Sequence, residues 1–167
     1  MATRVNVVLD PAGIRVNPNL DVEVKMQMKP GVAIVATPGR NIWTANMTEC
    51  ATVATYDHTD NSRTLCHGGG GNFAGHAGYI QDLAGKISAD TTIIFALGVD
   101  WNQNHTSERT AINSTKRAIE AEMTALNKAI NLLNWVEFWP PAWAVGQQQE
   151  RASFVLRPDG TYGEKLR

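Results

Sequence analysis

The chain has 167 residues, of which 43% are hydrophobic, and a formal net charge of −1 at pH 7. That length suits a single domain over residues 1–167 with its own core. The near-neutral charge provides no basic surface for nucleic acid, and no apolar run is long enough to span a membrane. No charged-then-apolar N-terminal segment directs the chain to a secretion channel, and export without a cleavable signal stays open, so the compartment is unknown.

Three short segments near the N-terminus have the patterns of strands. Residues 5–9 and 21–28 alternate apolar and polar side chains with a period of two, and residues 32–36 form a continuous apolar run. Proline and glycine residues separate these segments, as expected of turns. Residues 40–49 are expected to form a loop that leads to Cys50.

A hairpin is predicted in the middle of the chain. The run from Cys50 to Asp57 alternates as a half-buried strand does, the next six residues have turn chemistry, and the chain then extends again. Because the turn centres near residues 59 and 60, Cys50 falls opposite His67 or within two residues of it. Side-chain parity places Cys66 on the other face, where we expect a small buried hydrophobe.

The second half of the chain contains helices and strands. Apolar spacing predicts a helix over residues 74–88, and residues 91–97 indicate a strand buried on both faces. A longer helix begins at Ser107, a capping residue. Its apolar stripe consists of Ile112, Ile119, Met123, Leu126, Ile130 and Leu133. Residues 152–157 and 161–165 form a final hairpin. This order predicts an α+β fold, a sandwich of mixed or antiparallel β-strands with two main helices packed on the sheet.

Cys50 and His67 together suggest nucleophilic catalysis. A cysteine attacks as the thiolate, and a neighbouring imidazole takes up its proton and returns it to a leaving group. Cys50 follows a loop, where backbone N–H groups are free to bind an oxyanion. His67 precedes four glycines, which leave open space, so Gly68 and Gly69 are expected to bind substrate. The alternative is a core cysteine that meets an exposed histidine only through the register of the hairpin.

Thr44 adds a third residue to this pair. It stands six residues before Cys50, and His67 stands 17 residues after Cys50. This order and spacing resembles that of the CheD-type chemoreceptor glutamine deamidases. It is also similar, with larger differences in spacing, to the catalytic domains of the cytotoxic necrotizing factors and of lethal-factor-type deamidase toxins. The order of elements over residues 32–165 is similar as well.

The resemblance implies a cysteine-dependent protein deamidase, an amidohydrolase, in keeping with an effector or toxin domain. It makes Cys50 the nucleophile, His67 the acid and base, and Thr44 the residue that orients the imidazole. The partner is a protein substrate whose glutamine or asparagine amide becomes a carboxylate, and no metal or organic cofactor is required. Those families usually place Gly and Ser before the cysteine. This chain has Thr48 and Glu49 there, and Glu49 puts a negative charge beside the thiol.

A tryptophan-rich segment over residues 135–143 is a candidate docking surface. Its prolines favour an irregular conformation that leaves Trp139 and Trp143 partly exposed. Exposed aromatic side chains are preferred anchors for protein partners. We therefore expect these two tryptophans to bind the protein substrate, and packing in the core or at an edge is the alternative.

Other kinds of site fit the sequence less well. The glycine run lacks the Lys and Ser/Thr that end a phosphate-binding loop. His58, Cys66, His67 and His76 match no zinc-ligand spacing. Two other functions stay open: a thiol hydrolase or transglutaminase that uses the same cysteine, and a non-catalytic binding module that uses the tryptophans and buries Cys50.

Overall fold

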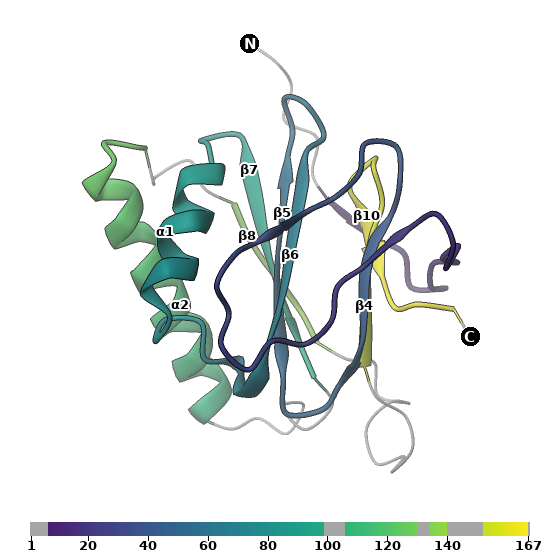
Figure 1. Ribbon diagram of the computed structural model, residues 1–167, viewed down its shortest axis with the longest axis horizontal. Coiled ribbons are helices and arrows are strands. Elements are labelled where there is room, and N and C mark those ends of the chain that lie inside the picture. Colours follow the sequence, from purple (N-terminus) through teal and green to yellow (C-terminus); the bar gives the residue numbers. More distant parts are fainter. Residues whose placement is uncertain (1–6, 99–105, 130–133, 140–151, 167) are drawn as a thin grey trace.

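Two stacked sheets and a layer of helices make up the fold. The computed structural model describes residues 7–98, 106–129, 134–139 and 152–166. Each sheet has five strands, and the two helices cover the outer face of one sheet, so that this sheet lies in the middle (Figure 1). The predicted α+β sandwich with two main helices packed on a sheet is confirmed, and the strands divide between two mixed sheets.

The middle sheet carries the predicted hairpin and has the strand order β3-β6-β5-β7-β8. Its strands are β3 (Ile34–Val35), β6 (Arg63–Gly68), β5 (Ala51–Asp57), β7 (Thr91–Leu97) and β8 (Asn134–Phe138). Every pair is antiparallel except β7 with β8. The strand β7 has its predicted bounds and is buried throughout, because the helices cover one of its faces and the second sheet covers the other.

The second sheet has the order β1-β10-β9-β4-β2. Its strands are β1 (Val8–Leu9), β10 (Thr161–Gly163), β9 (Ala152–Leu156), β4 (Ile42–Met47) and β2 (Val22–Glu23). The strands β9 and β10 form the predicted final hairpin. The strand predicted over residues 21–28 is much shorter, because the chain leaves this sheet after β2 and crosses to the middle sheet, where Gln27 bridges to Gly68.

The loop predicted over residues 40–49 is wrong, because β4 occupies most of it. Its first three residues, Ile42, Trp43 and Thr44, are all buried. A strand packed on both faces shows no alternation of apolar and polar residues. The polar Thr44 and Asn46 further interrupt the pattern, which is why the sequence did not indicate a strand.

Two helices pack side by side on the middle sheet, and their bounds are α1 (Ala77–Lys86) and α2 (Thr106–Ala125). The helix predicted over residues 74–88 is confirmed, with shorter bounds. The apolar stripe of α2 is buried at Ile112, Ile119 and Met123, whereas Leu126 is 51% exposed. Ile130 and Leu133 lie outside the described residues. No helix in the described ranges is long and apolar enough to cross a membrane.

The end of α2 is coupled to the end of α1. The chain reverses at Asn127, whose φ of 56° is left-handed, and this places the next residue, Lys128, beside α1. The Lys128 ammonium donates hydrogen bonds to the carbonyl oxygens of Ala84 (2.8 Å), Gly85 (3.2 Å) and Ile87 (2.8 Å). These carbonyls lack partners within the helix, so the lysine caps α1 and completes the helical layer.

Two apolar layers hold the fold together, one on each face of the middle sheet. Between this sheet and the helices lie large buried side chains, among them Val53, Phe73, Tyr79, Leu83, Ile93, Phe95, Ile112, Ile119 and Met123. Between the two sheets lie Ile42, Met47, Leu65, Ile94, Phe154 and Leu156 among others. Fully burying such a side chain contributes roughly 1.5–3 kcal/mol. Cys66 is 1% exposed in the helix-side layer, as predicted.

Candidate functional site

The three residues of the predicted triad come together between the two sheets. Thr44 belongs to β4 in the second sheet, His67 to β6 in the middle sheet, and Cys50 directly precedes β5. Cys50 and His67 line one pocket of about 320 Å³. Its other lining residues are Glu23, Val24, Lys25, Met26, Ala45, Asn46 and Thr48. The site is therefore assembled from both sheets and from the segment that crosses between them.

Thr44 fixes the orientation and the tautomer of His67. The Thr44 hydroxyl, which is fully buried, lies 2.6 Å from the carbonyl oxygen of Val24 and 2.7 Å from Nδ1 of His67. A carbonyl oxygen only accepts, so the single hydroxyl proton is donated to Val24. The hydroxyl oxygen then accepts a hydrogen bond from Nδ1–H of His67. In the neutral imidazole, Nε2 therefore carries the lone pair.

His67 is deeply buried, and its Nε2 has no hydrogen-bond partner among the residues that the structure describes. The residue is only 2% exposed, and burial lowers the pKa of its imidazole from 6.5 to about 4. The ring is therefore neutral at pH 7. A buried polar atom without a partner costs stability. His67 lines the same pocket as Cys50, so this lone pair is a candidate proton acceptor there.

Cys50 lies diagonally across from His67 in the hairpin. The register pairs Thr52 with His67 and Ala51 with Gly68, so Cys50 is two residues from direct opposition, within the predicted range. Diagonal neighbours in antiparallel strands lie about 7–8 Å apart. This explains why the thiol does not hydrogen-bond to Nε2 in this structure. Cys50 is half-buried, and Cys66 faces the helices instead.

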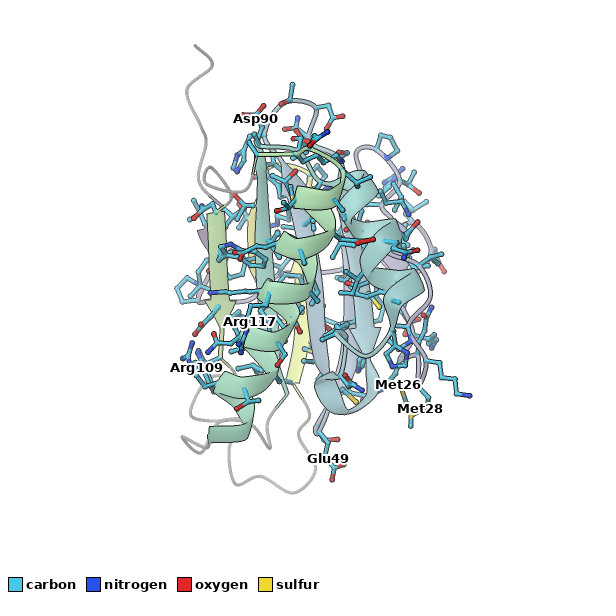
Figure 2. All side chains as sticks on the ribbon, turned by 90° about the vertical axis from the view of Figure 1, so that its left-hand side faces the viewer. Met26, Met28, Glu49, Asp90, Arg109 and Arg117 are labelled. Carbon is cyan, nitrogen blue, oxygen red and sulfur yellow. The ribbon has the colours of Figure 1, made fainter. Side chains whose placement is uncertain are left out.

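The loop before Cys50 is held against the end of β7. Gly98 donates its N–H to the carbonyl oxygen of Cys50 at 3.0 Å. In the described part of the chain, the N–H groups of Thr48 and Cys50 have no hydrogen-bond acceptor, so both can bind an oxyanion. Glu49 is exposed, does not line the pocket and points away from the molecule at this end (Figure 2). Its charge therefore projects toward solvent.

Gly68 and Gly69 do not leave the open space that the sequence suggested. A Cβ at Gly68 would meet the ring of Phe73 at 2.7 Å, and one at Gly69 would meet the sulfur of Met28 at 2.9 Å. Neither glycine lines the pocket that holds Cys50. Their missing side chains instead leave room for Phe73 and Met28, and Gly69–Gly71 form the short helix η1. The structure thus differs from the predicted substrate-binding role of Gly68 and Gly69.

Trp139 is not part of this site. It is half-buried, packs against the helix-side core and lines another pocket, of about 540 Å³, with Leu9 and Leu166. Its indole Nε1 donates to Glu137 at 3.3 Å. Trp139 is thus partly exposed, as predicted, and also packs against the core, as in the alternative, so its role in docking stays a prediction. Trp143, the other predicted docking residue, lies outside the described residues.

Three further residues of the site were not identified from the sequence. The Val24 carbonyl holds Thr44, Asn46 lines the pocket, and Gly98 supports the Cys50 loop. Gly98 had a usable signal, because it is a glycine directly after a buried strand. Val24 acts through its backbone, and the position of Asn46 depends on an irregularity in β4. Neither residue type therefore indicated from the sequence that the residue belongs to the site.

No family model matches the sequence, and no curated protein matches it. In the described ranges, no group of three or more His, Cys, Asp and Glu side chains could hold a metal ion. The geometry of Thr44, Cys50 and His67 is therefore the main basis for a functional proposal.

The burial of His67 predicts a specific dependence of stability on pH. Its folded pKa of about 4 lies below the ordinary value of 6.5. Between these values the unfolded chain binds a proton that the folded protein excludes, so stability falls as the pH falls. This contribution is fully present above pH 6.5, and up to about 3 kcal/mol of it is lost by pH 4.

Urea denaturation of wild type and His67→Gln between pH 4 and pH 7 measures this contribution. We expect the free energy of unfolding of the variant to decline less steeply between pH 6.5 and pH 4. Equal slopes for the two proteins would show that His67 titrates normally in the fold.

Proposed function

We propose that the protein is a cysteine-dependent amidohydrolase that deamidates a glutamine or asparagine side chain of a target protein. The observation that supports this most directly is the hydrogen bond between Thr44 and His67. It leaves Nε2 of His67 as a proton acceptor with no partner in the described ranges, in the pocket that Cys50 lines. A thiol, an oriented base and free N–H donors are the parts that acyl transfer needs.

The first half of the proposed reaction forms a thioester. The thiol proton of Cys50 passes to Nε2 of His67, directly or through one water, and the sulfur attacks the carboxamide carbon. The oxyanion accepts hydrogen bonds from the N–H groups of Thr48 and Cys50. The imidazolium then gives its proton to the amide nitrogen, the C–N bond breaks and ammonia leaves. Burial of His67 disfavours the charged imidazolium, so it makes this second transfer easier and the first transfer, from the thiol, harder.

The second half hydrolyses the thioester. Neutral His67 takes a proton from a water molecule, the hydroxide attacks the carbonyl carbon, and the C–S bond breaks. The proton held by His67 returns to the sulfur. The net reaction converts one amide and one water into a carboxylic acid and ammonia, and Cys50 is regenerated.

The surroundings of the pocket favour a protein as the substrate. Met26 lines the pocket and is 44% exposed, and the neighbouring Met28 is 71% exposed. Both side chains lie at the same end of the molecule as Glu49 (Figure 2). Exposed methionines adapt to apolar surfaces of partners, and they would have little to contact in a free amino acid.

The test is to incubate the wild-type protein with a panel of folded proteins and glutamine- or asparagine-containing peptides. Ammonia release is measured together with the mass change from amide to acid, which also locates the modified residue. We expect both signals to appear in equal amounts. Incorporation of an added primary amine at the same residue would identify transglutamination instead, and a panel without either product would count against the proposal.

A further inference from the structure

The strand β4 has an irregularity beside the pocket. It pairs with β9 through Thr44 and Phe154, and the next pair is Met47 with Ala152, so β4 contains one extra residue. Both Thr44 and Met47 are fully buried, although an odd spacing in a regular strand would put them on opposite faces. The bulge therefore lets Thr44 hold His67 while Met47 still enters the core, and it turns Ala45 and Asn46 toward the pocket.

Asn46 carries the conformational cost of this bulge. Its φ is 62°, in the left-handed region that favours glycine, although asparagine tolerates it better than most residues. Its side chain is exposed and makes no hydrogen bond with any described group. The bulge thus places an amide with both hydrogen-bonding functions available in the pocket that contains Cys50 and His67.

The other polar side chains at the pocket are less suited to recognising an amide. Glu23 and Lys25 pair with each other at 3.0 Å and are largely exposed. Thr48 offers one hydroxyl. Asn46 has an N–H donor for the oxygen of a primary carboxamide and an oxygen acceptor for its NH₂ group. Once the amide has become a carboxylate, the side-chain oxygen of Asn46 faces oxygen lone pairs and has no donor to accept from. Asn46 therefore favours the carboxamide substrate over the carboxylate product.

We infer that Asn46 is a specificity-determining residue whose side-chain amide binds the primary carboxamide of the substrate. This inference rests on the proposed deamidase function. A site built to hydrogen-bond a polar group discriminates strongly against molecules that lack it. The bulge in β4 is then the device that brings this residue to the reacting group.

The substitution Asn46→Gly tests the role of the side chain, because glycine adopts a positive φ without strain and preserves the bulge. We expect kcat/KM for deamidation to fall by about 10- to 100-fold, with the thermal midpoint retained. Asn127→Gly is the matched control: it makes the same change at the same left-handed conformation, at the end of α2, and it should keep wild-type activity. Full activity in Asn46→Gly, with loss only in Asn46→Ala, would overturn the inference, because backbone conformation alone would then matter.

A second readout separates this inference from the proposed function. Iodoacetamide and iodoacetate alkylate the same sulfur and differ in carrying a carboxamide or a carboxylate. We expect Cys50 of wild type to favour iodoacetamide more than Cys50 of Asn46→Gly does. A change in this ratio supports carboxamide binding even if no target releases ammonia. An identical ratio in the two proteins overturns the inference, whether or not the wild type deamidates a target.

Discussion

We expect Cys50→Ala to lower kcat for ammonia release from a target protein by roughly 10⁴-fold or more, and Cys66→Ala to keep this kcat within about twofold of wild type. Cys50 lines the pocket with His67, and the proposed reaction proceeds through a thioester on its sulfur. Cys66 is 1% exposed on the opposite face of the hairpin, and burial raises the pKa of its thiol to about 12. A buried thiol of that kind is neither ionised nor accessible.

The two variants are measured with the same target and the same protein concentration, after thermal unfolding has shown that both fold. Cys66→Ala removes a buried sulfur, and we expect it to cost about 1 kcal/mol of stability without changing kcat. Ammonia release that survives in Cys50→Ala would refute the nucleophilic role. Loss of activity in folded Cys66→Ala would show that the reaction depends on Cys66, contrary to the assignment of Cys50 as the nucleophile.

The relation of Cys50 to His67 was predictable because it is local. The polar turn has its centre near residues 59 and 60, and in a hairpin this fixes which residues oppose one another. The observed register, Thr52 with His67, follows from that centre. Parity then separates Cys50 from Cys66 without any knowledge of the remaining chain. The polar turn and the alternation of residue types in the sequence carried this information. The prediction of a half-buried strand was wrong, because β5 and β6 are covered on both faces.

The contact of Thr44 with His67 is of a different kind, because it joins two sheets. The Thr44 hydroxyl also donates a hydrogen bond to the carbonyl oxygen of Val24, which lies on the segment that crosses between the sheets. The sequence showed neither β4 nor this crossing. The spacing of Thr44 before Cys50 therefore singled out the residue only through the resemblance to known deamidases, and its place in the structure follows from long-range packing.

Gly68 and Gly69 show how a correct local signal led to a wrong expectation of open space. Four successive glycines indicate that the backbone needs room, and at Gly68 and Gly69 it does. The room is occupied by the side chains of Phe73 and Met28 and is not left for a ligand. A glycine in the sequence shows that a side chain is absent. The sequence around it does not show which side chains from other parts of the fold fill that space.

Gly98 is the residue outside the triad at which substitution is expected to affect the site most. It follows β7, and its N–H holds the carbonyl oxygen of Cys50 at 3.0 Å. A Cβ at this position would lie 2.2 Å from the carbonyl oxygen of Thr48 and 2.7 Å from that of Cys50. Both contacts are with backbone atoms, so no side-chain rotation relieves them. The loop that carries the proposed nucleophile and its oxyanion donors must move.

We therefore expect Gly98→Ala to lower kcat by about 100-fold, since a displacement of about 1 Å at the reacting atoms has this effect. The overpacking should also cost about 1–3 kcal/mol of stability. Activity is measured well below the unfolding temperature, so that both variants are folded. Gly85→Ala is the control: this glycine lies within α1 with no atom near its missing Cβ, and alanine there should raise stability by about 0.5–1 kcal/mol and leave kcat unchanged. If Gly98→Ala retained full activity, the position of the Cys50 loop would not depend on close contact with the end of β7. That result would also argue against the N–H groups of this loop as the oxyanion donors.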